Sequence, residues 1–169
     1  MTVISTERDA TNLTLTFVAE FDAPPERVWQ VWEDPRQLER WWGPPTYPAT
    51  FDEHDLRPGG RSAYYMTGPN GEKSHGWWQV VSIDPPHRLD FDDGFSDDDG
   101  APSPGMPVTR TEVTLESAGN GTRMTTVSRF ASLEQLEQLI EMGMQEGMRL
   151  AMGQIDTVLA DHEAEEAVR

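Results

Sequence analysis

The amino-acid sequence predicts an α+β fold in which an antiparallel sheet is followed by one long C-terminal helix. Three observations support this prediction. Residues 12–21 alternate apolar and polar side chains, the middle of the chain consists of short β-prone segments separated by strong turn sequences, and residues 132–161 repeat apolar side chains at helical spacing. Nothing in the pattern divides the chain, so we expect a single domain over residues 1–169 with its core at about 13–160.

The first predicted element is a strand. In NLTLTFVAEF, residues 12–21, every second residue is apolar, which is typical of a strand with one buried face. A short helix is expected next in DAPPERVWQVWED, because prolines occupy its first turn and Val28, Val31 and Trp32 follow at helical spacing, with Asp22 as a candidate cap.

A second short helix is predicted to begin after Asp34 and to reach the adjacent pair Trp41 and Trp42 in RWWGPP. Gly43 is expected to end it in a left-handed conformation, since the two prolines that follow cannot continue a helix. Only one indole of the pair can easily be buried at a helix end. The other is expected to border an opening, and the sequence leaves open which is which.

The middle of the chain predicts an antiparallel meander, with turns at RPGG (57–60), GPNGE (68–72), DPP (84–86) and AGNG (118–121). Its one long interruption is DDGFSDDDGAPSPGMP, at about 92–107, which we expect to be a mobile acidic loop because it is rich in Asp, Pro and Gly. Trp77 and Trp78 are adjacent in a strand, so only one of them can face the interior.

The long helix is predicted to start at Ser132, with Gln135 completing a capping box, and to end near Asp161 followed by a flexible tail. Gly143, Gly147 and Ala151 recur at every fourth position, and each glycine in a helix interior costs about 1 kcal/mol relative to alanine. Two explanations remain open: close packing on another backbone, or space beneath the helix for a ligand. The neighbouring methionines fit both, because Met fills gaps in cores and also lines adaptable cavities.

The composition excludes several classes of protein. The chain has 30 Asp and Glu but only 13 Lys and Arg, a formal net charge of -17, so nucleic acid is not an expected partner. With no Cys there is no disulfide, thiolate nucleophile or Cys-ligated metal. No stretch is long and apolar enough for membrane insertion and the start lacks a secretory signal, so a cytoplasmic protein is expected.

No motif demands an enzyme. The sequence has no nucleophile elbow, phosphate-binding glycine loop, zinc-protease helix or dinucleotide fingerprint. His54 and His75 lie in the sheet region, where a lone His is more often structural than catalytic. Arg57, Arg61 and Tyr64 could orient a polar group in a cavity, although such residues beside a Gly-Gly turn more often face solvent. We expect no catalytic residue, metal or cofactor.

Several ordered motifs together resemble a known family: PERVWQVWEDPRQLERWWGP, DLRPGG, MTGPNGE, DPPHRLDF and GTRMTTVSRF. From about Leu13 to Leu159 the chain resembles the START-like (SRPBCC) superfamily, and within it the branch named after the C-terminal domain of the activator of the heat-shock-protein-90 ATPase. The resemblance implies a helix-grip (Bet v 1-like) fold, in which a curved antiparallel sheet wraps around the long C-terminal helix and two short helices follow the first strand.

The resemblance also implies a cavity for a hydrophobic molecule between sheet and helix. One departure is Gly147-Met148, where the family often has Gly-Trp, a change that could enlarge the cavity. The candidate cavity residues are Trp41, Trp42, His54, Arg61, Tyr64, Trp78, Phe91, Ile140, Gly143, Met144, Gly147, Met148 and Ala151.

The expected function is non-catalytic binding of a small hydrophobic or aromatic molecule, for transport, sequestration or a stress response, by a monomer or homodimer. Two alternatives follow from the resemblance alone. One is a polyketide cyclase or aromatase-like enzyme, which would need His54 with Tyr64 or Arg61 inside the cavity. The other is an interaction module that modulates a chaperone ATPase.

Overall fold

The computed structural model describes residues 3–99 and 101–168, with side chains for residues 5–99 and 101–161. One eight-stranded, fully antiparallel sheet has the order β1-β2-β8-β7-β6-β5-β4-β3. Its strands are β1 (Val3–Asp9), β2 (Thr14–Phe21), β3 (Ala49–His54), β4 (Arg61–Thr67), β5 (Lys73–Asp84), β6 (Arg88–Phe95), β7 (Val108–Ala118) and β8 (Gly121–Arg129). The helices are α1 (Pro25–Glu33), α2 (Pro35–Leu38), α3 (Leu133–Glu141), α4 (Met144–Gly153) and α5 (Ile155–Val168).

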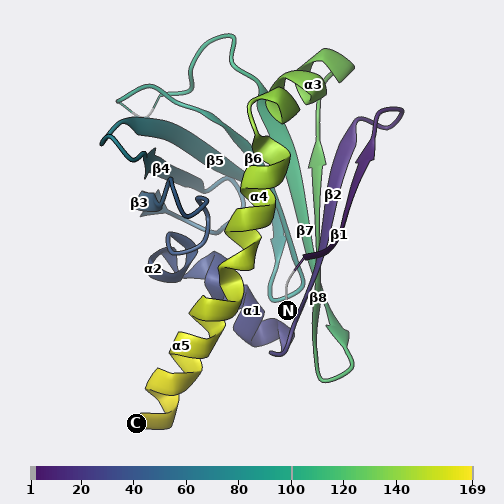
Figure 1. Ribbon diagram of the computed structural model, residues 1–169, viewed down its shortest axis with the longest axis vertical. Coiled ribbons are helices and arrows are strands. Elements are labelled where there is room, and N and C mark those ends of the chain that lie inside the picture. The colour runs from purple at the N-terminus through teal and green to yellow at the C-terminus, as the bar shows by residue number, and fades with distance from the viewer. Residues whose placement is uncertain (1–2, 100, 169) are drawn as a thin grey trace.

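The predicted fold class, a helix-grip, is confirmed. Figure 1 shows α3, α4 and α5 crossing one face of the curved sheet, with β1 and β2 on one side of the helices and β3 to β5 on the other. Each predicted turn sequence connects two consecutive strands: β3 to β4, β4 to β5, β5 to β6 and β7 to β8. None of the helices among the described residues is long and apolar enough to cross a bilayer.

One strand was missing from the prediction. β1 precedes the strand expected to come first and pairs with it along the edge of the sheet, so the two short helices follow the second strand. The sequence VISTERD gives little signal for this strand, because most of its described side chains are exposed and it has no buried face to impose an alternation.

The strand β2 carries the predicted buried face. Leu15, Phe17 and Ala19 are fully buried, and they form one core with Val28 and Trp32 of α1. The N-cap residue of α1 is Pro24 and not Asp22, so no side chain makes a capping hydrogen bond. A hydrophobic core of this kind, built between one face of a sheet and the helices that cover it, is what stabilises a two-layer α+β domain.

The end of α2 differs from the prediction. Asp34 caps the helix as expected by accepting a hydrogen bond from the backbone N–H of Arg36, but α2 ends at Leu38, and the Trp pair lies in the turns that follow. Gly43 does not adopt a left-handed conformation. Glycine is needed there for a different reason, since an added Cβ would lie 1.9 Å from the carbonyl oxygen of Tyr47.

The C-terminal helix is interrupted rather than continuous. Gly143, with φ of 90°, separates α3 from α4, and Gln154 separates α4 from α5. Figure 1 shows that α4 and α5 follow nearly one line, whereas α3 turns away from it. Gly143 therefore lies at a break and not in a helix interior, and it has the positive φ that favours glycine. The helix α5 continues to Val168, beyond the predicted end near Asp161. The side chains of the predicted tail lie outside the described residues.

The acidic segment is shorter than expected. β6 continues through Phe95, because Asp93 pairs with Trp78 of β5 on one side and with Thr109 of β7 on the other. The connecting segment begins only at Ser96, which forms an isolated bridge with Pro102. This shift places Asp93 in the sheet instead of in a loop.

Candidate functional site

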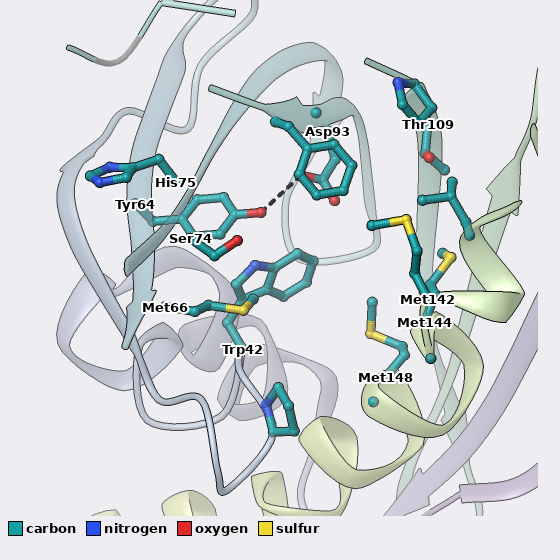
Figure 2. A pocket seen from close by; sticks show the side chains of 17 residues that line it. Trp42, Tyr64, Met66, Ser74, His75, Asp93, Thr109, Met142, Met144 and Met148 are labelled. Carbon is teal, nitrogen blue, oxygen red and sulfur yellow. Dashed lines mark hydrogen bonds between the residues drawn. The ribbon is translucent and has the colours of Figure 1, made fainter. Parts of the chain in front are cut away.

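A cavity of about 280 Å³ lies between the sheet and the helices α3 and α4. Its walls come from the segment after α2, from strands β4 to β7 and from both helices, and it is partly open to solvent. Most of its lining is apolar (Figure 2). The lining residues are Trp42, Pro44, Tyr64, Met66, Ser74, His75, Asp93, Gly94, Phe95, Pro107, Thr109, Leu139, Met142, Gly143, Met144, Gly147 and Met148.

On the helix side of the cavity, two glycines leave room between longer apolar side chains. A Cβ added at Gly147 would have no heavy atom within 4 Å beyond its own stretch of helix. Met144 and Met148 flank this position and point into the cavity from α4, as Figure 2 shows. Unbranched Met side chains can change rotamer to fit different apolar shapes. Of the two explanations for the glycines, open space rather than close packing applies at Gly147.

The structure distinguishes the two indoles of the Trp pair. Trp41 is fully buried, and its Nε1–H donates a hydrogen bond of 2.8 Å to the carbonyl oxygen of Val31. In a helix that carbonyl would accept from residue 35, but Pro35 has no N–H, so Trp41 supplies the missing donor. Trp42 borders the cavity. Among the described atoms, its buried Nε1 has no hydrogen-bond partner.

The polar end of the cavity consists of Tyr64 and Asp93. The phenol of Tyr64 donates a hydrogen bond of 3.1 Å to a carboxylate oxygen of Asp93, drawn as a dashed line in Figure 2. Tyr64 is 8% exposed, while Asp93 keeps some accessible surface because it borders the hollow. The pair therefore places one acidic group and one phenol in a mostly apolar space.

Burial dominates the electrostatics of this pair. It raises the pKa of Asp93 to about 7, and the hydrogen bond from Tyr64 opposes the rise only in part. Burial and the neighbouring Asp93 raise the pKa of Tyr64 well above its usual range. The indole N–H groups of Trp42 and Trp78 oppose that rise from close by, although neither makes a hydrogen bond of ordinary geometry. Near neutral pH the carboxyl of Asp93 can thus either accept or donate a proton.

His54 and Arg61 do not contribute to the cavity. The Nε2–H of His54 donates to the carbonyl oxygen of Trp32 over 2.8 Å, and its Nδ1 lies 2.7 Å from the hydroxyl of Ser62. Burial lowers the pKa of His54, which favours the neutral ring, and a neutral ring that donates at Nε2 can accept from the Ser62 hydroxyl at Nδ1. His54 therefore caps the C-terminal end of α1, and Arg61 is exposed. The pairing of His54 with Tyr64 or Arg61 inside the cavity is not formed.

Four other candidate residues lie behind the cavity wall or away from it. Trp78 is fully buried and faces the interior, with Phe91 stacked on it at 4.1 Å between ring centroids; both lie beneath Trp42. Ile140 packs against the core, and Ala151 is buried in α4. Of the candidate cavity residues, those that line the hollow are Trp42, Tyr64, Gly143, Met144, Gly147 and Met148.

Asp93, the acidic residue of the cavity, was not among the candidates predicted from the sequence. It lies in the run DDGFSDDDG, whose acidic character indicated a solvated loop. Other lining residues follow from strand alternation once one inward position is known: Met66 shares a face with Tyr64, and Ser74 shares a face with Trp78. Within the part of the chain that the structure describes, no group of three or more His, Asp or Glu side chains could hold a metal ion.

The fold and the site can be compared with known proteins. A protein from Arthrobacter aurescens, solved by NMR in solution, is 56% identical, with 95% of this chain and 93% of that chain covered and a TM-score of 0.91. Protein Ms6760 from Mycobacterium smegmatis, a crystal structure, is 49% identical over 93% of this chain and 96% of that chain, with a TM-score of 0.86. A Rhodobacter sphaeroides protein at 24% identity and a TM-score of 0.79, covering 93% of this chain and 98% of that chain, shows the same fold.

No curated protein matches the chain at a significant level. Residues 22–160, however, match the family described as activator of Hsp90 ATPase homolog 1-like protein. That match spans most of the chain and agrees with the helix-grip architecture and with the motifs that resemble the START-like superfamily. The chain therefore belongs to the activator of Hsp90 ATPase homolog 1-like family.

Proposed function

We propose that this protein binds a small hydrophobic or aromatic molecule, without transforming it, in the cavity between the sheet and the helices α3 and α4. The observation that carries the proposal is the open space at Gly147, where an added Cβ would meet no atom within 4 Å beyond its own stretch of helix, in a wall that is mostly apolar. A well-formed apolar cavity with a few convergent polar groups is the usual form of a small-molecule site.

The size of the hollow limits the affinity. A ligand that buries about 300 Å² of apolar surface gains roughly 7 kcal/mol at about 25 cal/mol per Å². The lost translational and rotational freedom of the ligand opposes this gain, so the hydrophobic contribution alone supports binding in the micromolar range. Tighter binding requires a hydrogen bond or charge at Tyr64 and Asp93.

The proposal can be tested by titrating the purified protein with neutral aromatic molecules such as 1-naphthol while following Trp fluorescence. We expect saturable quenching, because Trp42 borders the cavity and contacts the ring of Trp78 at 4.8 Å between centroids. Gly147→Leu should weaken the quenching by filling the hollow. Gly153→Leu is the matched control, since Gly153 lies on the same helix, is exposed and does not line the cavity.

Two results would count against the proposal. One is a flat titration across a varied set of apolar molecules, together with native mass spectra that contain no co-purified small molecule. The other is equal weakening by Gly147→Leu and Gly153→Leu, which would place the quenching site elsewhere.

A second candidate is an enzyme of the polyketide cyclase or aromatase type. The residues first considered for it are not assembled, but Tyr64 and Asp93 form a different pair within hydrogen-bonding distance. A carboxyl whose pKa is about 7 suits general acid–base catalysis at neutral pH. Conversion of a poly-ketone substrate that is lost in Asp93→Asn, with binding retained, would favour this candidate over simple binding.

The family description favours a third candidate, an association with the Hsp90 ATPase. A pull-down with the chaperone and a measurement of its ATPase rate test this directly. Co-precipitation with a changed rate would support it, whereas an unchanged rate without co-precipitation would contradict it.

A further inference from the structure

The polar end of the cavity offers hydrogen-bond acceptors more readily than donors. The hydrogen of the Tyr64 phenol is directed to Asp93, and the indole Nε1 atoms of Trp42 and Trp78 are buried and make no hydrogen bond of ordinary geometry among the described atoms. The second carboxylate oxygen of Asp93 has no described hydrogen-bond donor. A ligand group that meets this pair is therefore best matched when it donates hydrogen bonds.

The charge around Asp93 is uncompensated. None of the described lining residues is Lys or Arg. On the same strand, the neighbouring Asp92 has a cation, because Arg110 contacts it at 2.6 Å on the opposite face of the sheet. Asp93 has no such partner, and its pKa is shifted by burial and by Tyr64 rather than by a nearby positive charge. A largely buried carboxylate without a cation is costly, so it either takes up a proton or gains from a cation that a ligand supplies.

The other elements packed around Asp93 supply no positive charge either. From β5, His75 lines the cavity at its edge, and its ring turns outward (Figure 2). The ring lies next to Tyr65 and 3.5 Å from Asp98. From β7, the neighbour is the uncharged Thr109. The charged residues of α4, Glu146 and Arg149, pair with each other on its exposed side, and neither lines the cavity. The cavity wall contributed by α3 and α4 consists of Leu139, Met142, Gly143, Met144, Gly147 and Met148.

We propose that the cavity selects hydrophobic amines, whose ammonium group pairs with the carboxylate of Asp93 while the apolar body lies among Trp42, Met144 and Met148. This inference rests on the proposed function and names the chemical class of its ligand. A charge-assisted hydrogen bond from N–H to carboxylate is about twice as strong as a neutral one. The net charge of -17 also concentrates organic cations near the protein and repels organic anions.

The test compares three ligands of similar shape: 2-phenylethylamine, 2-phenylethanol and 3-phenylpropionate. Calorimetric titration at about pH 8, where most Asp93 is ionised, should give a dissociation constant about tenfold or more lower for the amine than for the alcohol. The propionate should bind most weakly. At about pH 5.5 the preference for the amine should largely disappear, because the carboxyl is then protonated while the amine remains charged.

Two matched variants locate the effect. Asp93→Asn should weaken binding of the amine far more than binding of the alcohol, so that the preference for the amine is lost. Asp92→Asn removes the same charge from the same strand, on the face away from the cavity, and should keep the preference. In the wild-type protein, the amine should also lower the pKa of Asp93, measured by carbon-13 NMR of its carboxyl, a readout that does not depend on either variant folding.

The outcomes separate the two proposals. If the alcohol binds as tightly as the amine, or if Asp93→Asn keeps the preference, the selection of amines is wrong while the hydrophobic site stands. If none of the three ligands nor 1-naphthol binds, the proposed function itself fails, and the further inference fails with it.

Discussion

The ring of Tyr64 lies directly over Gly76 of the neighbouring strand. A Cβ added at Gly76 would come within 2.4 Å of ring carbon Cζ and 2.5 Å of the phenol oxygen. Tyr64 and Gly76 are paired residues of β4 and β5. Because Gly76 has no side chain, the phenol ring can lie against its backbone and reach Asp93. A glycine in a strand interior often marks such a close approach.

Gly76→Ala should therefore displace Tyr64 and break its hydrogen bond to Asp93. We expect the free energy of unfolding to fall by about 1–3 kcal/mol, the usual range for overpacking. The pKa of Asp93 should rise further, because the bond from Tyr64 is the contribution that lowers it. Urea denaturation and carbon-13 NMR of the carboxyl measure the two effects. In a Tyr64→Leu background the same substitution should cost much less; an equal cost would mean that the ring is not what Gly76 accommodates.

The raised pKa of Asp93 predicts an unusual pH dependence of stability. In the folded protein this pKa is about 7, compared with 3.8 for an unperturbed Asp, so between these values the folded state holds a proton that the unfolded state has lost. Ionisation of Asp93 thus lowers the free energy of unfolding as pH rises from about 4 to about 7. The full shift corresponds to about 4 kcal/mol, and the exposure of Asp93 to the partly open cavity makes the expected loss smaller.

The measurement is the difference between wild type and Asp93→Asn in urea denaturation across this pH range, because the many other carboxyl groups of the chain are common to both proteins. The free energy of unfolding of Asp93→Asn, measured relative to that of wild type, should increase as pH rises. Asp92→Asn should follow the wild-type slope. Parallel curves for wild type and Asp93→Asn would show that Asp93 does not carry the shifted proton.

The sequence predicted correctly those features that depend on residues close together in the chain, and it missed features that depend on contacts between distant residues. Alternation in β2, the proline-started helices and the turn sequences are set by residues close together in the chain, and they predicted the fold class correctly. β1 was missed because an exposed edge strand has no buried face. Asp93 was missed because its place depends on pairing with Trp78 and Thr109, which are distant in the sequence.

The same distinction applies to the C-terminal helix. Its apolar spacing predicted a continuous element, and both Gly143 and Gly147 were placed in its interior. The left-handed backbone of Gly143 depends on how α3 turns away from α4, which side-chain periodicity does not record. The open space at Gly147 likewise depends on how far the sheet lies from the helix.

These two glycines should respond oppositely to the same substitution. Gly147→Ala should raise the free energy of unfolding by about 1 kcal/mol, since alanine has the higher helix propensity and its methyl group meets no other atom. Gly143→Ala should lower the free energy of unfolding by about 1 kcal/mol or more, because alanine is strained at a φ of 90°. Gly153→Ala is a control for the gain in propensity alone. Urea denaturation measures all three, and a loss of stability in Gly147→Ala would contradict the open space there.

The two adjacent Trp residues predict separable effects on stability and on binding. Trp41→Phe removes the donor that satisfies the carbonyl oxygen of Val31, which Pro35 cannot satisfy, and it should lower the free energy of unfolding by about 1–3 kcal/mol. Trp42→Phe removes an indole N–H that has no described partner, so it loses no hydrogen bond of ordinary geometry and should be less destabilising.

Ligand binding should show the reverse order. Trp42 borders the cavity and Trp41 does not, so Trp42→Phe should reduce the quenching by 1-naphthol, while Trp41→Phe should keep it at temperatures where that variant stays folded. Urea denaturation and fluorescence titration of the same two variants separate the roles. If Trp41→Phe loses the quenching while Trp42→Phe retains it, the ligand lies on the other side of the pair, within the core and not in the hollow beneath α4.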